Sequence, residues 1–459
     1  MHRSNQLRHI FTIVLAFATL FAGACGGGGS SQSAAGLLPV PPAGGHNHGL
    51  PTPTPTPTSV GATPTPTPTP VQTSANVAAH VQDYTFWQYD GSATNVPASY
   101  MAAWATWVET SGSSYANAFH AAGGKYAVAY TDPNYYYVGP GYTAPGNYPE
   151  TAFGHGSDGT RTQRPEGGGT EYYLNPASAG SQSGYLGIVN AIAASGGFNY
   201  IYADGVSDSL ATSLYRMSPT PVEITTNAAY VAGMQALMAL SPLPMIINGY
   251  NNGSPLTVEQ EFVGSSNIAA PFGEGCFAYR TSLLTDTPYQ HKWSDMANAL
   301  LATTSRGYPA ICGGRGDLAD NRALRMYYVA SWWLTYDPNY SVSLELMTSS
   351  SNVYLFPEQL IVPTNPVQSP GSSISSLQSS TGAYVRQFGA CYYDKVAWGS
   401  CAAIVNPSYD NTVNMPAVAA NYHHALVLDN NNLFDGGQAT LSNSVPASLA
   451  PGTAIVLFQ

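Results

Sequence analysis

The chain has 459 residues, of which 8% are charged, and its formal net charge is −11. This length accommodates an export segment and two folded domains. Because 25 Asp and Glu outnumber 14 Lys and Arg, neither nucleic acid nor an anionic membrane surface is an expected partner. Aromatic residues make up 12%, and their flat rings suit sugar faces as well as protein cores.

The first 25 residues have the layout of a signal peptide. Arg3 and Arg8 precede an apolar run at residues 10–22, which is too short for a membrane-spanning helix. The run ends in AGAC, which resembles the lipobox of bacterial lipoproteins and predicts lipidation of Cys25. Ordinary cleavage nearby, followed by free secretion, is the alternative. Both place the mature protein outside the cytoplasm, with membrane contact only through an N-terminal lipid.

Residues 26–75 predict a disordered linker rather than a folded unit. They contain a glycine run and two Thr-Pro runs, at 51–57 and 63–70. Alternating proline favours polyproline II, which extends by about 3.1 Å per residue. We therefore expect a stalk that holds the folded part away from its anchor.

Residues 76–365 alternate strand-like and helix-like segments, which predicts an α/β fold, a (β/α)8 TIM barrel. The eight expected strands lie at 81–91, 124–133, 171–176, 198–203, 244–250, 269–279, 308–314 and 342–347, and the expected helices at 97–110, 184–195, 227–240, 257–263, 291–305 and 320–335. The Gly, Pro and Tyr-rich stretch at 134–170 is expected to be an excursion without regular structure. Excursions of that length are usually functional or disordered.

Residues 370–459 show short apolar alternations broken by Asn, Gly and Pro, which predicts a small C-terminal antiparallel β-sandwich. Besides Cys25 the chain has four cysteines, which permit three pairings. We favour Cys391 with Cys401, across a hairpin, and Cys276 with Cys312, on neighbouring barrel strands. Their spacing does not resemble a zinc motif, so we expect neither a metal site nor another cofactor.

Acidic residues are scarce, so their positions carry information. Asp90, Asp132, Asp204 and Glu274 fall at or near the carboxyl ends of the first, second, fourth and sixth expected strands, and Asn248 lies at the end of the fifth. The carboxyl ends of barrel strands form the face on which barrel enzymes keep their chemistry. Glycoside hydrolysis needs such convergence, because one carboxyl protonates the leaving oxygen while another attacks the sugar or activates water.

Asp204 is the expected nucleophile or base, and Glu274 the expected proton donor. Glu274 is flanked by Pro271, Phe272 and Cys276, and such apolar surroundings raise the affinity of a carboxyl for its proton. Asp204 precedes Gly205 and can be reached by water. The alternatives are a loop-fixing aspartate at 204 and a hydrogen-bond acceptor in a strand bulge at 274.

The remaining candidates are expected to bind substrate. We expect Asp90, Asp132 and Asn248 to form hydrogen bonds with sugar hydroxyls. The candidate stacking platforms are the aromatic residues near these strand ends, for each of which core packing is the alternative: Trp87, Tyr135, Tyr136, Tyr137 and Tyr250.

The order of several segments resembles a family of bacterial glycoside-hydrolase barrels that is similar to endo-α-polygalactosaminidases and, more distantly, to α-galactosidase-type enzymes. The matching pieces are EYYLNP, YIYADGV, INGY, the Glu-bearing sixth strand and YYVASWWLTYDP, followed by AAIVNPS and LAPGTAIVLF. In α-galactosidase-type barrels the acids after strands four and six are the catalytic pair, so the resemblance implies those roles for Asp204 and Glu274.

Two functions follow as hypotheses. The first is an exported, monomeric glycosidase acting on an extracellular or cell-wall polysaccharide. The second is a non-catalytic carbohydrate-binding or surface-structural lipoprotein that keeps the barrel, because a fold does not guarantee a function.

Overall fold

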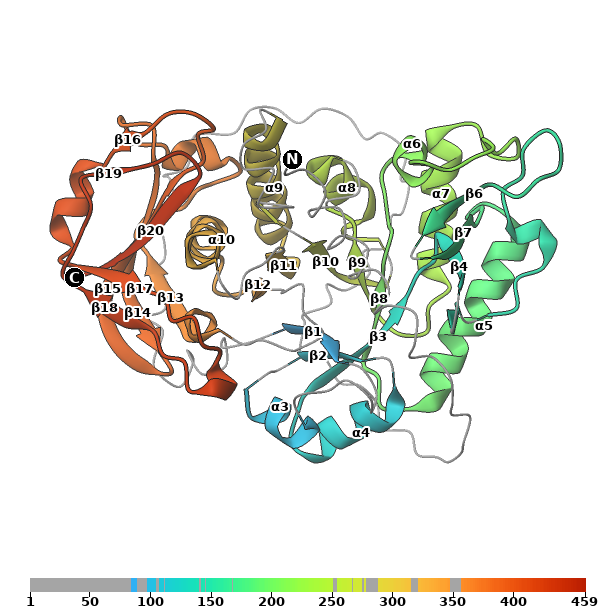
Figure 1. The fold of residues 1–459 in the computed structure, drawn as a ribbon, viewed down its shortest axis with the longest axis horizontal. Coiled ribbons are helices and arrows are strands. Elements are labelled where there is room, and N and C mark those ends of the chain that lie inside the picture. Colours follow the sequence, from blue (N-terminus) through green and yellow to red (C-terminus); the bar gives the residue numbers. More distant parts are fainter. Residues whose placement is uncertain are drawn as a thin grey trace, which may run out of the picture.

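Figure 1 shows the computed structural model of the chain. It describes residues 84–88, 97–104, 107–110, 112–139, 142–144, 146–166, 168–250, 254–265, 267–274, 276–277, 288–314, 321–346 and 356–459. The expected signal peptide, Cys25, the linker and Asp90 lie outside the described residues, as do the side chains of Trp87 and Glu274. Within the described part, no helix is long and apolar enough to cross a membrane.

Eight parallel strands form one sheet, in the order β1-β2-β3-β8-β9-β10-β11-β12. Their bounds are β1 Tyr84–Gln88, β2 Trp107–Thr110, β3 Tyr126–Thr131, β8 Tyr200–Ala203, β9 Met245–Asn248, β10 Ile268–Glu274, β11 Ala310–Gly314 and β12 Ser341–Leu346. The two outermost strands in this order, β1 and β12, also contact each other. Continuous burial of β8 and β9 agrees with a parallel sheet that is covered on both faces.

Alternate residues of each strand enter different cores. Tyr200 and Tyr202 of β8 join a cluster with Trp107 and Phe272, whereas Ile201 of the same strand joins a cluster formed with helices. The rings of Tyr202 and Phe272 meet edge-on with their centroids 5.5 Å apart. The period-two alternation of a strand therefore separates an aromatic layer from the helical layer.

The helices lie between these strands in the chain. They are α3 Ala98–Trp104, α4 Ser113–Ala121, α5 Ala179–Ser195, α6 Leu210–Ser213, α7 Asn227–Ala239, α8 Pro255–Phe262, α9 Pro288–Ser305 and α10 Arg322–Thr335. Side chains cap several of them: Ser178, Thr226 and Asn321 each accept a backbone N–H from the first turn of α5, α7 and α10. These caps satisfy donors that helical hydrogen bonding leaves unpaired.

Two predictions about the strands are wrong. The parallel sheet nevertheless has the expected eight strands, because one strand that was missed is offset by one that belongs to another sheet. The expected helix at 97–110 ends early, and its last four residues form β2. The expected third strand, at 171–176, instead contributes to β7 (Gly169–Tyr173) of a separate antiparallel sheet. Asp204 and Glu274 thus remain on the fourth and sixth strands, but Asp132 follows the third. The four-residue β2 is too short to produce a distinct pattern after a helix.

The stretch 134–170 is not irregular, because it builds most of a four-stranded antiparallel sheet in the order β5-β4-β7-β6. The remaining strands of this inserted sheet are β4 Tyr135–Gly139, β5 Tyr142–Thr143 and β6 Gln163–Glu166, and a 3-10 turn, η2, spans Glu150–Ala152. Tyr135 lies opposite Tyr173, and Tyr136 opposite Tyr172. Such cross-strand aromatic pairs stabilise a small sheet that has few aliphatic residues.

The C-terminal part is an antiparallel sheet in the order β13-β14-β15-β20-β17-β18, accompanied by the pair β16–β19. Its elements are η4 Pro357–Leu360, β13 Ile361–Pro366, η5 Ile374–Leu377, β14 Tyr384–Tyr393, β15 Val396–Asn406, β16 Val413–Asn414, η6 Ala417–Asn421, β17 His424–Val427, η7 Leu433–Asp435, β18 Thr440–Ser442, β19 Ser448–Leu449 and β20 Thr453–Phe458. Ala403 faces the core around α10, whereas Ile404 packs with Leu449 of β19. Both faces of the sheet are therefore covered.

Two disulfides join the cysteine pairs that the sequence analysis favours. Cys276 is bonded to Cys312, and Cys391 to Cys401. The first links the end of β10 to β11, and the second crosses the β14–β15 hairpin. Disulfides are typical of proteins that fold in an oxidising compartment.

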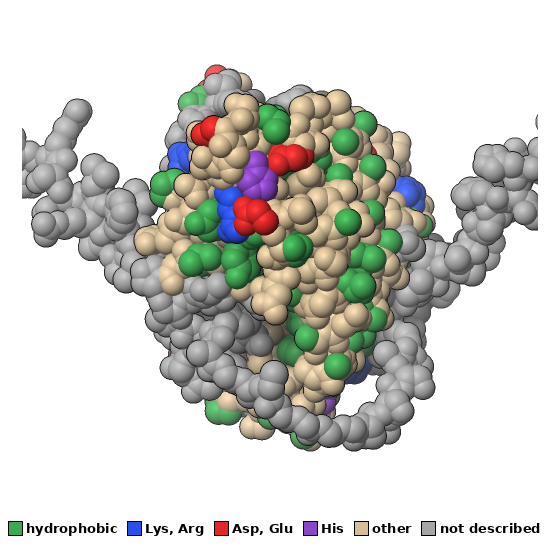
Figure 2. All heavy atoms as spheres, turned by 90° about the vertical axis from the view of Figure 1, so that its right-hand side faces the viewer, with side chains coloured by type: hydrophobic (Ala, Val, Ile, Leu, Met, Phe, Trp, Pro, Cys, Tyr) green, Lys and Arg blue, Asp and Glu red, His purple; other side chains and the backbone are tan. Residues whose placement is uncertain are grey.

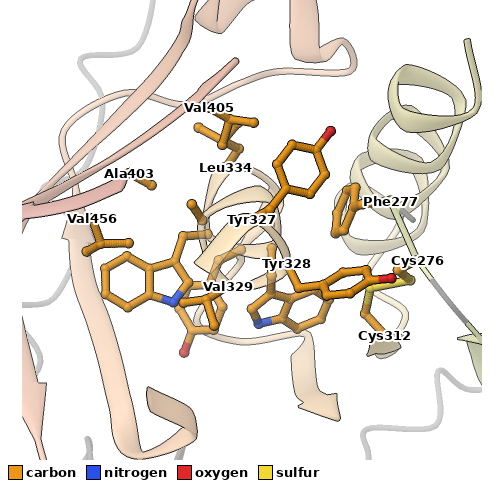
Figure 3. Close-up of a cluster of buried hydrophobic side chains, with 14 of the residues drawn as sticks. Cys276, Phe277, Cys312, Tyr327, Tyr328, Val329, Leu334, Ala403, Val405 and Val456 are labelled. Carbon is orange, nitrogen blue, oxygen red and sulfur yellow. A yellow bond between two sulfur atoms is a disulfide. The ribbon is translucent and has the colours of Figure 1, made fainter. Parts of the chain in front are cut away.

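Helix α10 joins the parallel sheet to the C-terminal sheet. In Figure 3, Tyr328 lies towards the Cys276–Cys312 disulfide, while Ala403 and Val456 of the C-terminal sheet lie on the other side of the helix. Every residue of α10 from Leu324 to its end is buried. The two regions therefore share one continuous apolar core.

A buried ion pair crosses the same boundary. Arg325 Nε of α10 lies 3.0 Å from a carboxylate oxygen of Glu358, and both side chains are fully buried. The guanidinium also covers the ring of Phe356 and donates to the carbonyl of Asp429. Burial raises the pKa of Glu358 to about 7 although Arg325 opposes this shift. The pair is thus costly to desolvate and costly to break.

We expect Glu358→Leu to lower the free energy of unfolding by about 3–5 kcal/mol, because it leaves the Arg325 guanidinium buried without an acid. Arg325→Met should cost less, because Glu358, whose pKa is already raised to about 7, takes up a proton when the guanidinium is removed. The double variant is expected to lie much closer to wild type. Urea denaturation of all four proteins measures this cycle. Glu150→Gln, which breaks an exposed pair with Arg161, is the control and is expected to cost at most about 1 kcal/mol. Additive losses in the double variant would contradict the expectation.

Candidate active site

The carboxyl ends of β3, β8 and β9 bring polar side chains together around Asp204. Thr131 pairs with Ala203, and Ala203 with Ile247, so the residues that follow these strands meet at one edge. Asp204 accepts hydrogen bonds from the Tyr130 hydroxyl, from Asn248 Nδ2 and from the N–H of Gly205, each at 2.8 Å. Three donors from three segments hold this carboxylate in one orientation.

Asn248 is buried at the end of β9, and its amide donates to Asp204. This contact fixes the orientation of the carboxylate. The structure therefore gives Asn248 a partner within the site, and its contact with a sugar stays a prediction. Tyr130, which the sequence analysis does not single out, has the same orienting role from β3.

Asp132 follows β3 and faces the same loop. Its Oδ1 accepts the N–H groups of Asn134, at 2.9 Å, and Tyr135, at 3.0 Å, which closes a tight turn. Burial raises the pKa of Asp132 well above its usual range, and the negative charges of Asp204 and Glu171 raise it further, although the two backbone hydrogen bonds oppose the shift. Asp132 and Asp204 therefore have different hydrogen-bond partners at the same edge of the sheet.

Gly205 follows Asp204 in the chain and lies close to the carboxylate of Asp132. Its φ is +68°, and a Cβ at this position would lie 3.3 Å from Asp132 Oδ1 and 3.3 Å from the ring of Tyr135. Its N–H is bonded to Asp204. A glycine is thus required both by the left-handed backbone and by the close approach of the Asp132 carboxylate.

Arg164 and Glu171 bring a third carboxylate from the inserted sheet. They lie opposite each other on β6 and β7, with N–O distances of 2.5 Å. Arg164 also covers the ring of Tyr135 and donates to the carbonyl of Tyr215 at 3.1 Å. Burial raises the pKa of Glu171, with Arg164 opposing the shift. The scarcity of charge in this chain could have drawn attention to both residues, but their hairpin pairing was not predicted.

The candidate stacking platforms make internal contacts. The ring of Tyr135 lies under Arg164, and its hydroxyl donates to the carbonyl of Ser213. Tyr136 packs edge-on against Tyr148 and Phe153.

Tyr250 is completely buried. Its hydroxyl is hydrogen-bonded to Thr303, and its ring belongs to the core. This environment matches the packing alternative for that residue.

The backbone of β10 places Glu274 at the same edge of the sheet. Phe272 pairs with Asn248, and Glu274, two residues further on, pairs with Gly313 of β11. The N–H of Cys276 donates to the Gly313 carbonyl at 2.7 Å, and its sulfur is bonded to Cys312. The segment after Glu274 is therefore anchored to β11.

A second charged cluster lies on the surface. The face in Figure 2 carries few charged side chains apart from a patch that gathers histidine, acidic and basic groups. Among the described residues, His155 is at the centre of a cluster of this kind. Its two ring nitrogens contact Glu150, at 2.9 Å, and Glu223, at 2.8 Å. Glu150 also pairs with Arg161. The hydrogen bond to Glu150 raises the pKa of His155 most, and the bond to Glu223 adds to it.

A hollow of about 530 Å³ lies between α5 and β3, and none of the three acids lines it. Its walls include Gly184, Gly187 and Ile188 of α5 and Ala129 of β3. Within the described ranges, no group of three or more His, Cys, Asp or Glu residues is placed to hold a metal ion.

Comparisons with known proteins add only remote likenesses. No family model and no curated protein sequence matches the chain. The glycoside hydrolase domain of PelA from Pseudomonas aeruginosa is similar over 59% of this chain and 98% of its own, with 12% identity and a TM-score of 0.38. An alpha-amylase from Geobacillus thermoleovorans is similar over 83% and 98%, with 8% identity and a TM-score of 0.38.

The GH36 alpha-galactosidase AgaA from Geobacillus stearothermophilus is similar over 79% of this chain and 52% of its own, with 9% identity and a TM-score of 0.36. These neighbours are glycoside hydrolases. At such TM-scores the likeness carries no inference about activity.

Gly205→Ala is expected to lower the free energy of unfolding by more than the ~1–2 kcal/mol that a left-handed alanine costs, because its Cβ also meets Asp132 and Tyr135. The matched control is Gly436→Ala, where the backbone is left-handed (φ +79°, ψ +19°) and nothing lies within 4 Å of the added Cβ. Urea denaturation compares the two variants. Equal losses would show that the contact with Asp132 does not constrain residue 205.

The His155 imidazole is expected to titrate above the ordinary value of about 6.5, because both ring nitrogens face carboxylates. Its stabilising contribution is then complete below the unfolded-state pKa and is lost as the pH rises through the folded-state pKa. Histidine NMR titration measures the midpoint.

Glu150→Gln should lower this midpoint more than Glu223→Gln, since the Glu150 hydrogen bond has the larger effect. Glu166→Gln removes another exposed carboxylate of the inserted sheet and should leave the midpoint unchanged. A midpoint at or below 6.5 in the wild type would contradict the proposed contacts.

Proposed function

We propose that the protein is a glycoside hydrolase that cleaves glycosidic bonds of an extracellular or cell-wall polysaccharide. The observation that carries this proposal is the convergence of acids at one edge of the parallel sheet: Asp132 and Asp204 follow the neighbouring strands β3 and β8, and β10, which carries Glu274, ends at the same edge. Asp204 is held by three hydrogen-bond donors, and burial together with neighbouring negative charges raises the pKa of Asp132. Glycoside hydrolysis uses a pair of carboxyls that flank the scissile bond.

In the proposed reaction, Asp204 acts as nucleophile or as the base that activates water. Glu274 is the proposed proton donor to the leaving oxygen, because its strand ends at the same edge. The contact between β1 and β12 supports closure of the sheet into a (β/α)8 barrel, and the two covered faces of the C-terminal sheet support a sandwich. Asp90, Asp132, Asn248 and Trp87 remain proposed sugar contacts.

We further propose export through a signal peptide at residues 1–25, attachment to the membrane by a lipid on Cys25, and a linker at 26–75. The two disulfides agree with folding outside the cytoplasm. A monomer with a catalytic unit at 76–365 and a β-sandwich at 370–459 completes the proposal.

The second candidate is a carbohydrate-binding or surface-structural lipoprotein without activity. One observation favours it: the hydrogen bonds on Asp204 come from β3, β9 and its own loop, which is also what a loop-fixing aspartate requires. Retained polysaccharide binding with no turnover would identify this function.

We expect Asp204→Asn and Glu274→Gln each to reduce sugar release from a hydrolysable polysaccharide by about 10²–10⁴-fold, because each removes a group that acts on the reacting bond. Reducing-end release from a panel of polysaccharides measures this. Asp410→Asn is the control, since Asp410 is an exposed acid of the C-terminal region. Equal, near-zero release by wild type and variants across the panel would refute the enzyme and leave the binding protein.

A further inference from the structure

We propose that the Cys276–Cys312 disulfide is a positioning element of the site, which closes the turn that carries Glu274 and holds this residue at the carboxyl edge of the parallel sheet. The importance of Glu274 for sugar release rests on the proposed function. The closure of the turn does not, because it follows from backbone, sulfur and core contacts.

The disulfide and two backbone hydrogen bonds close the turn at the end of β10. The Cys276 N–H lies 3.3 Å from the Gly273 carbonyl, three residues earlier, and 2.7 Å from the Gly313 carbonyl of β11. In the register of β10 and β11, Cys312 lies opposite Gly273. Glu274 lies opposite Gly313. The S–S bond therefore returns from Cys276 to the residue that faces Gly273, so β11 contacts the chain on both sides of Glu274.

Gly273 leaves the space that the disulfide occupies. A Cβ at this position would lie 2.5 Å from the Cys276 sulfur and 3.2 Å from the ring of Tyr250. The backbone of Gly273 is not in the left-handed region, so its conformation does not require glycine. The requirement comes chiefly from the sulfur, which packs directly against the backbone that precedes Glu274.

The residue after the turn has a backbone conformation that a large side chain rarely adopts. Phe277 has a φ of +61° and is buried beside Trp293 of α9, with the ring centroids 6.3 Å apart. In Figure 3, Phe277 and Tyr328 lie next to the disulfide. A bulky residue stays in the left-handed region only where its surroundings hold it there, and such residues gather at functional sites. The disulfide and the aromatic core supply that constraint immediately after the turn.

The turn follows a strand that is bonded towards Asp204. Phe272 of β10 pairs with Asn248 of β9, and Asn248 donates to Asp204 at 2.8 Å. On its other side, the chain is bonded to β11 through Cys276. Glu274 lies between these two attachments. Loss of the second attachment is expected to release the backbone of Glu274 while Asp204 keeps its hydrogen bonds.

The second disulfide offers a matched comparison. Cys391 and Cys401 are also fully buried, and they belong to the same core around α10 as the first pair. They join β14 to β15 of the C-terminal sheet and have no contact with the turn in the β10–β11 pairing. Their removal therefore weakens the shared core without opening the turn.

The test compares Cys276→Ala/Cys312→Ala with Cys391→Ala/Cys401→Ala by hydrogen exchange of the full chain, measured by mass spectrometry. We expect the first variant to raise the exchange rate of residues 272–277 by about tenfold or more, while β8 and β9 keep their wild-type rates. The control variant should leave residues 272–277 unchanged. Unchanged exchange at 272–277 in the first variant would overturn the proposal. An equal rise over β8 and β9 would also overturn it, because the disulfide would then stabilise the whole sheet and not the turn.

If the first variant does not fold, the wild-type chain decides. The Cys276 N–H, which donates to the Gly313 carbonyl, should exchange as slowly as the amides of β9. Exchange of this amide within seconds in the native chain would overturn the proposal, because the disulfide would not hold the turn.

Sugar release tests the link to Glu274 by a double-variant cycle. Loss of the Cys276–Cys312 disulfide is expected to lower kcat by about 10–100-fold with little change in KM, because a displaced proton donor affects the reacting bond and not substrate binding. Glu274→Gln should then cost much less in the disulfide-free chain than in wild type. Equal costs in both backgrounds would overturn the positioning role. A wild-type chain that releases no sugar refutes the proposed function, and hydrogen exchange alone then decides whether the disulfide holds the turn.

Discussion

The site depends on the hydrogen bonds that hold Asp204. Its two carboxylate oxygens are shared among a tyrosine of β3, an asparagine of β9 and the backbone of its own loop. These donors meet only because β3, β8 and β9 are neighbours in parallel register, so that the residues after Thr131, Ala203 and Ile247 reach the same level. The sheet thus fixes the carboxylate from both sides. A parallel sheet provides this arrangement because neighbouring strands end side by side, so that side chains of β3 and β9 reach the carboxylate that follows β8.

Two buried arginines among the described residues join segments that are distant in sequence. Arg325 pairs with Glu358 between α10 and the C-terminal sheet, and Arg386 of β14 donates to the carbonyls of Trp333, Leu334 and Tyr336 at the end of α10. A helix end leaves such carbonyls without intrahelical partners, so a buried guanidinium both caps the helix and holds the sheet against it. The boundary between the two regions is consequently a shared core with specific polar contacts.

Much of this organisation follows from the sequence, because short continuous apolar runs that end in turn residues, such as those before Asp204 and Asn248, indicate strands buried on both faces. The eight strands in one parallel sheet were predicted in number, but only because missing β2 was offset by counting β7. The segment around Glu171 shows what the sequence does not determine. Its pattern correctly indicates a strand, but no neighbouring residue indicates which sheet that strand joins. The pairing of Arg164 with Glu171, and the hydroxyl of Tyr130 on Asp204, are products of that long-range choice and could not be read from neighbouring residues.

The inserted sheet sets the electrostatics of the site because it is held to the loop that follows Asp204. Arg164 and Tyr135 donate to the carbonyls of Tyr215 and Ser213, and Gln163 and Ser218 exchange backbone hydrogen bonds. His155 and Glu223 add a contact between the same two segments. Since the sheet and the loop are joined at several points, the same bonds that fix the loop after Asp204 also hold the strands that carry Arg164 and Glu171. An insertion between two strands of a parallel sheet can therefore tune a neighbouring carboxyl without contributing a residue to the strands themselves.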